Sequence, residues 1–256
     1  MTELIASLGQ WWIGYIRGIG RMAILLKNVT VSTFTPPFRP RLLVNQMEFI
    51  GVRSLFVIVL TGTFTGMVLA LQSFHAFSKF NAESLVGATV ALSLTRELGP
   101  VLTAILVTAR AGSAMAAELG TMRVTEQIDA MTTMAVDPID YLIVPRILAS
   151  LVMVPLLTVI FNFAGIIGGY GVGVTHLHIS SGALINKMID MTDLQDLTHG
   201  LYKSIVFGLL LSLIGCYKGY YTTRGAEGVG RATTESVVLS SVLILVTDYF
   251  LTDILF

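Results

Sequence analysis

The chain has 256 residues, of which 54% are hydrophobic and 12% are charged, and its formal net charge is zero at pH 7. Soluble domains carry about 25% charged residues, so a soluble fold of this composition would lack polar surface to face water. Zero net charge also gives no electrostatic support for nucleic-acid binding, and the single cysteine, Cys216, excludes an internal disulfide. The composition therefore predicts an integral membrane protein, whose apolar side chains face lipid.

The first forty residues predict an amphipathic helix at the membrane interface, followed by a proline-rich linker. Apolar residues recur at spacings of three and four, as on one helix face: Leu4, Leu8, Trp11, Tyr15, Ile19, Met22 and Leu26. Arg17 and Arg21 fall elsewhere, which suits a helix lying in the plane of the interface. The alternative is a sixth crossing of the membrane. Pro36, Pro37 and Pro40 then interrupt the helix before the first span.

Five later segments are long and apolar enough to cross a membrane, because a spanning helix needs about 20 apolar residues. They run over residues 52–71, 85–120, 147–174, 205–221 and 237–256. We therefore expect an all-α integral membrane protein with an interfacial N-terminal helix and about five transmembrane helices.

Basic residues are distributed unevenly between the two sides of these spans. One side carries Arg17, Arg21, Lys27, Arg39, Arg41, Arg53, Arg123, Arg146, Lys218, Arg224 and Arg231. The other side carries Lys79, Lys187 and Lys203, together with Asp190, Asp193 and Asp196 in the loop between the third and fourth spans. Because cytoplasmic loops are enriched in Lys and Arg, we expect a cytoplasmic N-terminus and, after five crossings, a C-terminus on the outer side.

A charged pair lies inside the second apolar segment. Arg96 and Glu97 would sit at membrane depth, where a charge costs about 2.5–3.5 kcal/mol and therefore faces protein or water. Adjacent residues do not share a helix face, so we expect at least one of them to have a partner elsewhere. Pro100 removes the amide that would bond the carbonyl of Arg96, which predicts a kink. The pair either lines a transport cavity or forms a structural ion pair that fixes helix packing.

The last part of the second segment is rich in small residues. Two rows at four-residue spacing are Ala109, Ser113 and Ala117, and Gly112, Ala116 and Gly120. Rows of this kind let helix backbones approach closely, so we expect tight helix packing here.

A short amphipathic helix is predicted between the second and third spans. Val124, Ile128, Met131 and Ala135 form one apolar stripe, and the proline after Asp137 predicts the end of the helix. The helix is too short to cross a membrane. It is either a solvated connection or a segment that lies in the groove of a partner. Its methionines would suit such an adaptable contact surface.

Aromatic residues mark the end of the first span. Phe74, Phe77 and Phe80 are spaced by three, as expected for an aromatic belt at the outer interface. The alternative is that they line a cavity of lipid size.

The sequence lacks familiar motifs for catalysis and metal binding. It contains no phosphate-binding glycine loop with Lys-Ser/Thr, no HExxH, no Cys/His cluster of metal spacing and no GxSxG. We therefore expect no catalytic residue and no metal site on this chain. His176 and His178 are interpreted as interface residues.

Four long motifs resemble the MlaE permease family. They are SLTRELGPVLTA (residues 93–104), ARAGSAMAAELGTMRVTEQIDA (109–130), VDPIDYLIVPR (136–146) and RATTESVV (231–238). The resemblance extends from about Arg41 nearly to the end of the chain. It implies one permease domain over residues 1–256, with an elbow helix and linker at 1–40 and a transmembrane bundle at 41–256.

The resemblance also implies partners and a cargo. Such permeases are homodimers in the inner membrane of Gram-negative bacteria. Cytoplasmic ABC ATPase subunits, which hold the ATP and Mg, drive them, and a STAS-domain subunit is often attached. A periplasmic MCE-domain ring covers the outer face. The complex moves phospholipid between the inner membrane and a periplasmic carrier and so maintains outer-membrane lipid asymmetry.

The resemblance assigns roles to particular residues of this sequence. The predicted short helix matches the family's ATPase-coupling helix, at Glu126, Gln127, Ile128, Asp129, Met131 and Met134. Arg96 and Glu97 match charged positions near a lipid cavity at the dimer interface. Residues that would line or flank this cavity are Leu69, Phe77, Phe80, Leu98 and Lys203.

Two rival readings come from other functional classes. An ion-coupled secondary transporter could use Arg96 and Glu97 as a proton relay, although no inverted repeat with paired broken helices is visible. An intramembrane lipid enzyme would need a nucleophile and a base within reach of each other, and the sequence offers no recognisable set.

Overall fold

The computed structural model describes residues 2–35 and 39–255, with side chains from Ile16 onward. Within these ranges every regular element is helical. Five helical runs are long and apolar enough to cross a membrane: Pro40–Phe80, Glu83–Val124, Ile139–Thr175, Leu194–Tyr220 and Gly225–Leu255. The predicted all-α, multi-pass membrane fold with five spans is thus confirmed.

The first three spans combine α-helices with short 3₁₀ or π turns, and the last two are single α-helices. The first holds α2 (Pro40–Ile50), η1 (Val52–Ser54), α3 (Leu55–Phe77) and η2 (Ser78–Phe80). The second holds η3 (Glu83–Leu85), α4 (Val86–Ser93), η4 (Leu94–Leu98), α5 (Gly99–Val107), η5 (Thr108–Gly112) and α6 (Ser113–Val124). After α7 (Gln127–Thr133), the third holds η6 (Ile139–Ile143) and α8 (Val144–Thr175), and α9 (Ser181–Met191) precedes α10 (Leu194–Tyr220) and α11 (Gly225–Leu255).

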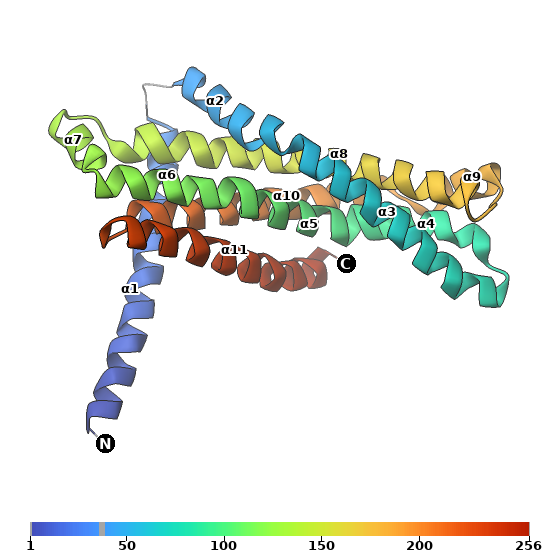
Figure 1. Cartoon of the computed structure of the whole chain (residues 1–256), viewed down its shortest axis with the longest axis horizontal. Helices are drawn as coiled ribbons and strands as arrows, with labels where there is room; N and C mark the ends of the chain where they lie inside the picture. The colour runs from blue at the N-terminus through green and yellow to red at the C-terminus, as the bar shows by residue number, and fades with distance from the viewer. Residues whose placement is uncertain (1, 36–38, 256) are drawn as a thin grey trace.

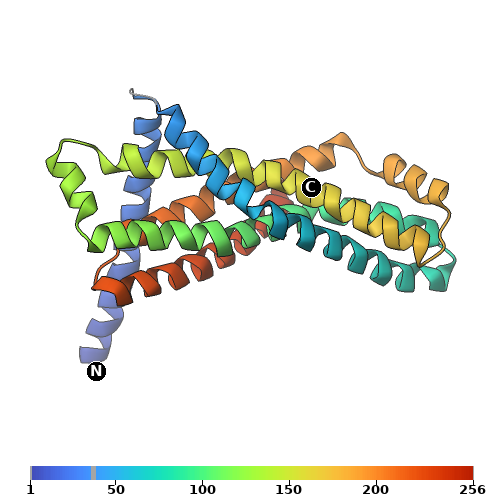
Figure 2. The ribbon, with the colours of Figure 1, turned by 45° about the horizontal axis from the view of Figure 1, so that its top comes forward.

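The spans form an elongated bundle with distinct ends (Figure 1). α7 lies at one end, and α4 and α9 lie at the other. Figures 1 and 2 both show α11 alongside only part of the bundle, with the C-terminus about midway along it. The face beyond the C-terminus is therefore not covered by α11.

α1 (Thr2–Thr33) runs across the bundle near the α7 end instead of along it (Figures 1 and 2). This is the placement expected of an interfacial helix, and α1 is not one of the five candidate spans among the described residues. Leu25 and Val29 are buried against the bundle, whereas Ile16, Ile19 and Ile24 are exposed.

The residues of the predicted apolar face of α1 have different surroundings. Met22 and Leu26 pack on the core, whereas Ile19 is exposed, because the buried face is centred on Leu25 and Val29. The predicted residues Leu4, Leu8, Trp11 and Tyr15, and the prolines Pro36 and Pro37, lie outside the described side chains.

The fourth span begins earlier than predicted, at Leu194 instead of residue 205. Asp196 and Lys203, assigned from the sequence to the outer side, therefore lie inside α10 and are buried. The charged residues lower the hydropathy of the first turns of α10, so the sequence predicts a loop there. In the structure, partners on other helices neutralise these charges. The loop before α10 also contains the unpredicted helix α9.

The structure refines two further predictions. One concerns the break in the second span, and the other concerns the short helix after that span. The predicted break near Pro100 takes the form of a π turn, η4, directly before it. The short helix α7 ends at Thr133, before Asp137, and Ala135 has a left-handed φ of 58°.

One of the two small-residue rows packs as expected. A side-chain carbon on Gly215 would lie 3.1 Å from the carbonyl oxygen of Gly112, and one on Gly219 would lie 2.8 Å from that of Ala116. This close approach joins α10 to η5 and α6. The other predicted row does not form such a seam, because Ala109 is exposed and Ser113 and Ala117 are only half-buried.

Candidate functional site

Five ionisable side chains and one hydroxyl meet where η4, α10 and α11 come together. They are Arg96, Glu97, Asp196, Lys203, Asp248 and Thr252. We refer to these six residues as the charge cluster. Its location near the end of α11 places it in the middle of the bundle's long axis (Figure 1).

The backbone of α10 brings three of its residues to η4. Asp196 and Lys203 lie on the same side of the helix, with Gly200 between them. A side-chain carbon on Gly200 would lie 2.1 Å from the carbonyl oxygen of Thr95, so only glycine permits this approach. The small residue thus sets the distance at which the charged side chains of the two segments meet.

Asp196 links the start of α10 to η4. Its Oδ2 accepts the amide of Asp193 at 3.0 Å, as part of a capping box that begins the helix. Its Oδ1 lies 2.6 Å from a guanidinium nitrogen of Arg96. One carboxylate therefore caps α10 and neutralises a charge in the adjacent span.

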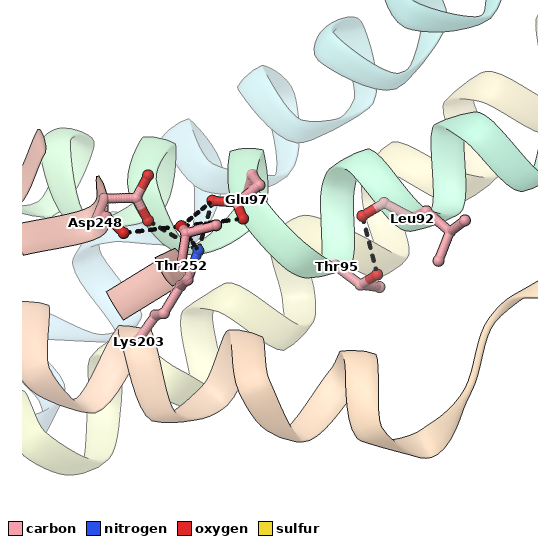
Figure 3. Close-up of polar contacts among 6 residues, drawn as sticks. All are labelled: Leu92, Thr95, Glu97, Lys203, Asp248 and Thr252. Carbon is pink, nitrogen blue, oxygen red and sulfur yellow. Dashed lines mark hydrogen bonds and ion pairs between the residues drawn. The ribbon is translucent and has the colours of Figure 1, made fainter. Parts of the chain in front are cut away.

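Lys203 is the centre of the second part of the cluster (Figure 3). Its Nζ lies 2.5 Å from Glu97 Oε2 and 3.1 Å from Asp248 Oδ1, and it donates to Thr252 Oγ1 at 2.8 Å. The lysine is fully buried. A buried ammonium is tolerated because two carboxylates and a hydroxyl replace the water it has lost.

The expectation that Arg96 or Glu97 has a partner elsewhere is confirmed for both. The adjacent residues point to different partners, Arg96 to Asp196 and Glu97 to Lys203. They are also the accessible members of the cluster, with side chains 40% and 37% exposed, whereas those of Asp196 and Lys203 are 4% and 0% exposed. The buried residues thus hold a guanidinium and a carboxylate at an accessible surface.

The structure brings together only part of the predicted cavity set. Glu97 and Lys203 are in direct contact. Leu69, Phe77 and Leu98 are half-buried and pack against the hydrophobic core. Phe80 is 79% exposed in η2. Phe77 is the last residue of α3 and Phe80 the last of η2, and α3 ends toward the α4 and α9 end of the bundle (Figure 1).

Asp196, Asp248 and Thr252 were missed as site residues. Asp248 lies in the predicted fifth span, so the argument from charge at membrane depth, applied to Arg96, would have found it too. Asp196 carried no such signal because the start of α10 was read as a loop.

The predicted coupling segment lies at the end of the bundle, as α7 and its flanks (Figure 1). Ile128 is buried, and Met131 packs partly on the core. Glu126, Gln127, Asp129 and Met134 are exposed. Arg123 Nη1 lies 2.6 Å from Asp129 Oδ1, which ties α7 back to α6. Of the predicted stripe, Ile128 and Met131 face the protein, whereas Val124 and Ala135 are exposed.

The groups that could hold a metal were also considered. Within residues 2–35 and 39–255, no three His, Cys, Asp or Glu side chains are grouped as metal ligands. The charge cluster holds acids and bases in mutual pairs and can offer a charged surface to a polar headgroup.

Comparison with known proteins extends these observations. The family model of the MlaE permease matches residues 43–254. A probable ABC transporter permease protein of Rickettsia typhi is 45% identical, over 98% of each chain. The intermembrane phospholipid transport system permease protein MlaE of Haemophilus influenzae is 39% identical, over 100% of this chain and 98% of its own.

Another relative matches over a smaller share of its length. The chloroplastic protein trigalactosyldiacylglycerol 1 of Arabidopsis thaliana is 40% identical over 83% of this chain and 61% of its own. The match of the family model over most of the chain, together with full-length relatives above 30% identity, fixes the assignment. The chain belongs to the MlaE permease family.

Proposed function

We propose that this chain is the membrane permease of an ABC transporter that moves phospholipid, with the cargo held between two copies of the chain. The observation that carries the proposal is the charge cluster, whose accessible Arg96 and Glu97 interrupt an otherwise apolar membrane surface. A phospholipid has the matching chemistry, because its phosphate suits a guanidinium and its acyl chains suit apolar helix faces. The name of the Haemophilus influenzae relative supports the same cargo.

The homodimer has support in the exposed apolar faces of α11 and α3. The apolar 18-residue stretch of α11 is 11% buried, the smallest share among the corresponding stretches of the five spans. Its exposed apolar side chains include Val238, Val242, Leu245, Val246, Tyr249 and Phe250. α3 exposes Phe56, Leu60, Phe64 and Val68. In the proposed dimer, α11 faces the second copy, and each chain provides one wall of the cavity.

An ATPase partner is proposed from the relatives and from the absence of a nucleotide motif in the sequence. The Rickettsia typhi relative is described as an ABC transporter permease, and such permeases act with separate ATPase subunits. ATP and Mg would bind to that subunit, and this chain would bind no cofactor. The STAS-domain subunit and the periplasmic MCE-domain protein are proposed from the family resemblance.

The proposed location is the bacterial inner membrane, with a cytoplasmic N-terminus and a periplasmic C-terminus. Basic residues gather at the α7 end of the bundle, on α1, α6 and the α10–α11 turn. The enrichment of Lys and Arg in cytoplasmic loops supports this orientation. Transport in this setting would maintain lipid asymmetry of the outer membrane.

The proposed mechanism connects α7 to the charge cluster. Closure of the ATPase dimer would press on the exposed side of α7, while buried Ile128 transmits the force to α6. α6, α5 and η4 form one continuous span that leads to Arg96 and Glu97. Movement of this span relative to α11 would change the shape of the cavity between the two copies and release the lipid.

The proposed role of α7 predicts that a substitution there weakens ATPase binding without changing the stability of the permease. Met134→Asp should leave the stability of the permease within about 0.5 kcal/mol, because Met134 is 75% exposed. It should lower ATPase affinity about tenfold or more, as loss of an apolar interface anchor does. Met191→Asp, an exposed methionine in α9, is the matched control. Unchanged ATPase binding by Met134→Asp, measured by co-purification and titration, would contradict the assignment.

The lipid role of Arg96 can be separated from its structural role. Arg96→Ala alone leaves the buried Asp196 unpaired, so a loss of activity would be ambiguous. The double variant Arg96→Ala with Asp196→Asn removes the pair and should recover stability. Its ATP-dependent transfer of phospholipid between vesicles should stay about tenfold reduced, because a hydrogen bond to a charged group contributes roughly 1.5–3 kcal/mol. Normal transfer by a stable double variant would show that Arg96 is structural.

The same vesicles test the rival transporter class. The Lys203–Glu97–Asp248 network has the composition of a proton relay. Transport that proceeds without an ATPase and stops when the proton gradient is removed would favour an ion-coupled transporter and reject the ABC proposal.

A further inference from the structure

A second charged pocket lies at the α7 end of the bundle, away from the charge cluster. It occupies about 330 Å³ between α1, the end of α10 and the start of α11. Four cationic side chains line it, those of Arg21, Lys218, Arg224 and Arg231, against one carboxylate, Glu235. We refer to it as the basic pocket. Its volume lies in the range of small-ligand sites, roughly 300–1,000 Å³.

The single carboxylate does not balance the cations. Glu235 binds Lys218 Nζ at 2.7 Å and Arg231 Nε at 2.6 Å. Its charge is therefore shared between two cations. Among carboxylates of the described residues, none forms an ion pair with Arg21 or Arg224. Glu227, the other acid at this end of α11, is exposed and does not line the pocket. The pocket keeps a net positive charge.

Two structural features fix the cations around the pocket. The guanidinium of Arg21 lies over the ring of Tyr221, 5.6 Å from its centre, and this ring contacts Tyr217. A guanidinium whose flat face lies on an aromatic ring still presents the N–H groups along its edge to a ligand. Arg224 has a left-handed φ of 71°, which turns the chain sharply into α11. Gly228, in the first turn of α11, also borders the pocket.

The pocket lies where lipid headgroups are expected. It is bounded by the points at which two spans end, at Tyr220 and Gly225. Its third wall is α1, which crosses the bundle and exposes Ile16, Ile19 and Ile24. Exposed apolar residues beside basic ones place such a helix at the boundary between acyl chains and headgroups.

We propose that the basic pocket binds the phosphate of an anionic phospholipid in the leaflet at the α7 end of the bundle. Basic pockets between transmembrane helices recognise anionic headgroups in this way. The lipid would bridge α1 to the α10–α11 turn and would be distinct from any cargo at Arg96. The proposal does not rest on transport activity, because binding can be measured on the permease alone.

The test uses the delipidated full-length chain in detergent, titrated with phosphatidylglycerol or with phosphatidylcholine of the same acyl chains. Native mass spectrometry gives the dissociation constant of each. The wild type should prefer phosphatidylglycerol. The double variant Arg21→Gln with Arg224→Gln should bind it about thirtyfold more weakly, since each basic residue near a membrane surface contributes about fivefold.

Two controls keep the result interpretable. Arg41→Gln removes an exposed arginine of α2 that does not line the pocket, and it should bind phosphatidylglycerol as the wild type does. Arg21→Lys with Arg224→Lys keeps both charges and should retain most of the affinity, which separates charge from folding. Equal affinity of the wild type and the Gln double variant would overturn the proposal.

A parallel titration with inorganic phosphate distinguishes a lipid from a soluble source. A lipid site should show phosphatidylglycerol binding that millimolar phosphate displaces only weakly, because the acyl chains and α1 add to the affinity. Phosphate binding that depends on Arg21 and Arg224, without preference for phosphatidylglycerol, would keep the phosphate site but assign it to a soluble ligand. Binding of neither probe would reject the site.

Discussion

Replacing Lys203 by methionine is expected to lower the free energy of unfolding by about 3–5 kcal/mol, the usual cost of removing one partner from a buried ion pair. Lys203 is fully buried and lies against Glu97 and Asp248. Its loss would leave the carboxylates of Glu97 and Asp248 close together without the buried cation between them. Equilibrium unfolding in mixed micelles, followed by circular dichroism, measures the change.

A compensated variant distinguishes charge from packing in this experiment. Lys203→Met combined with Glu97→Gln and Asp248→Asn removes all three charges. Most of the lost stability should return, because neutral groups of similar size are often tolerated in place of a buried ion pair. Lys79→Met is the matched control, since Lys79 is exposed in η2. A Lys203→Met protein as stable as the wild type would show that the cluster is hydrated and not a buried network.

Gly66→Ala is the second substitution with a large expected effect, a loss of about 1–3 kcal/mol or more from overpacking. A side-chain carbon at Gly66 would lie 1.8 Å from the carbonyl oxygen of Gly165. The added carbon and the backbone oxygen are both fixed to packed helices, so α3 and α8 would have to separate. Unfolding in the same mixed micelles measures this loss.

The control for this substitution lies on the partner helix. A side-chain carbon on Gly171 of α8 would meet nothing within 4 Å. Gly171→Ala should therefore be neutral or stabilising, by up to about 1 kcal/mol from helix propensity. Similar stabilities for the two alanine variants would contradict the close α3–α8 packing.

The number and type of the membrane helices followed from the sequence because the physical signal is local. A run of about 20 apolar residues is long enough and apolar enough to cross a bilayer, independently of the rest of the chain. All five predicted spans are present, and α1 lies across the bundle. The same reasoning was wrong at the start of α10, because Asp196 and Lys203 look like loop residues until their partners are known.

Three conclusions therefore follow from the sequence alone: the membrane-embedded helical class, the presence of charges at Arg96 and Glu97, and the family resemblance that the comparisons confirmed. Which residues those charges contact depends on the tertiary structure. Glu97 meets Lys203, which is 106 positions away, and Thr252, which is 155 positions away. Pairing over such distances depends on helix packing, including the approach of Gly200 to Thr95. A local pattern shows that a buried charge needs a partner, but only the packed bundle selects it.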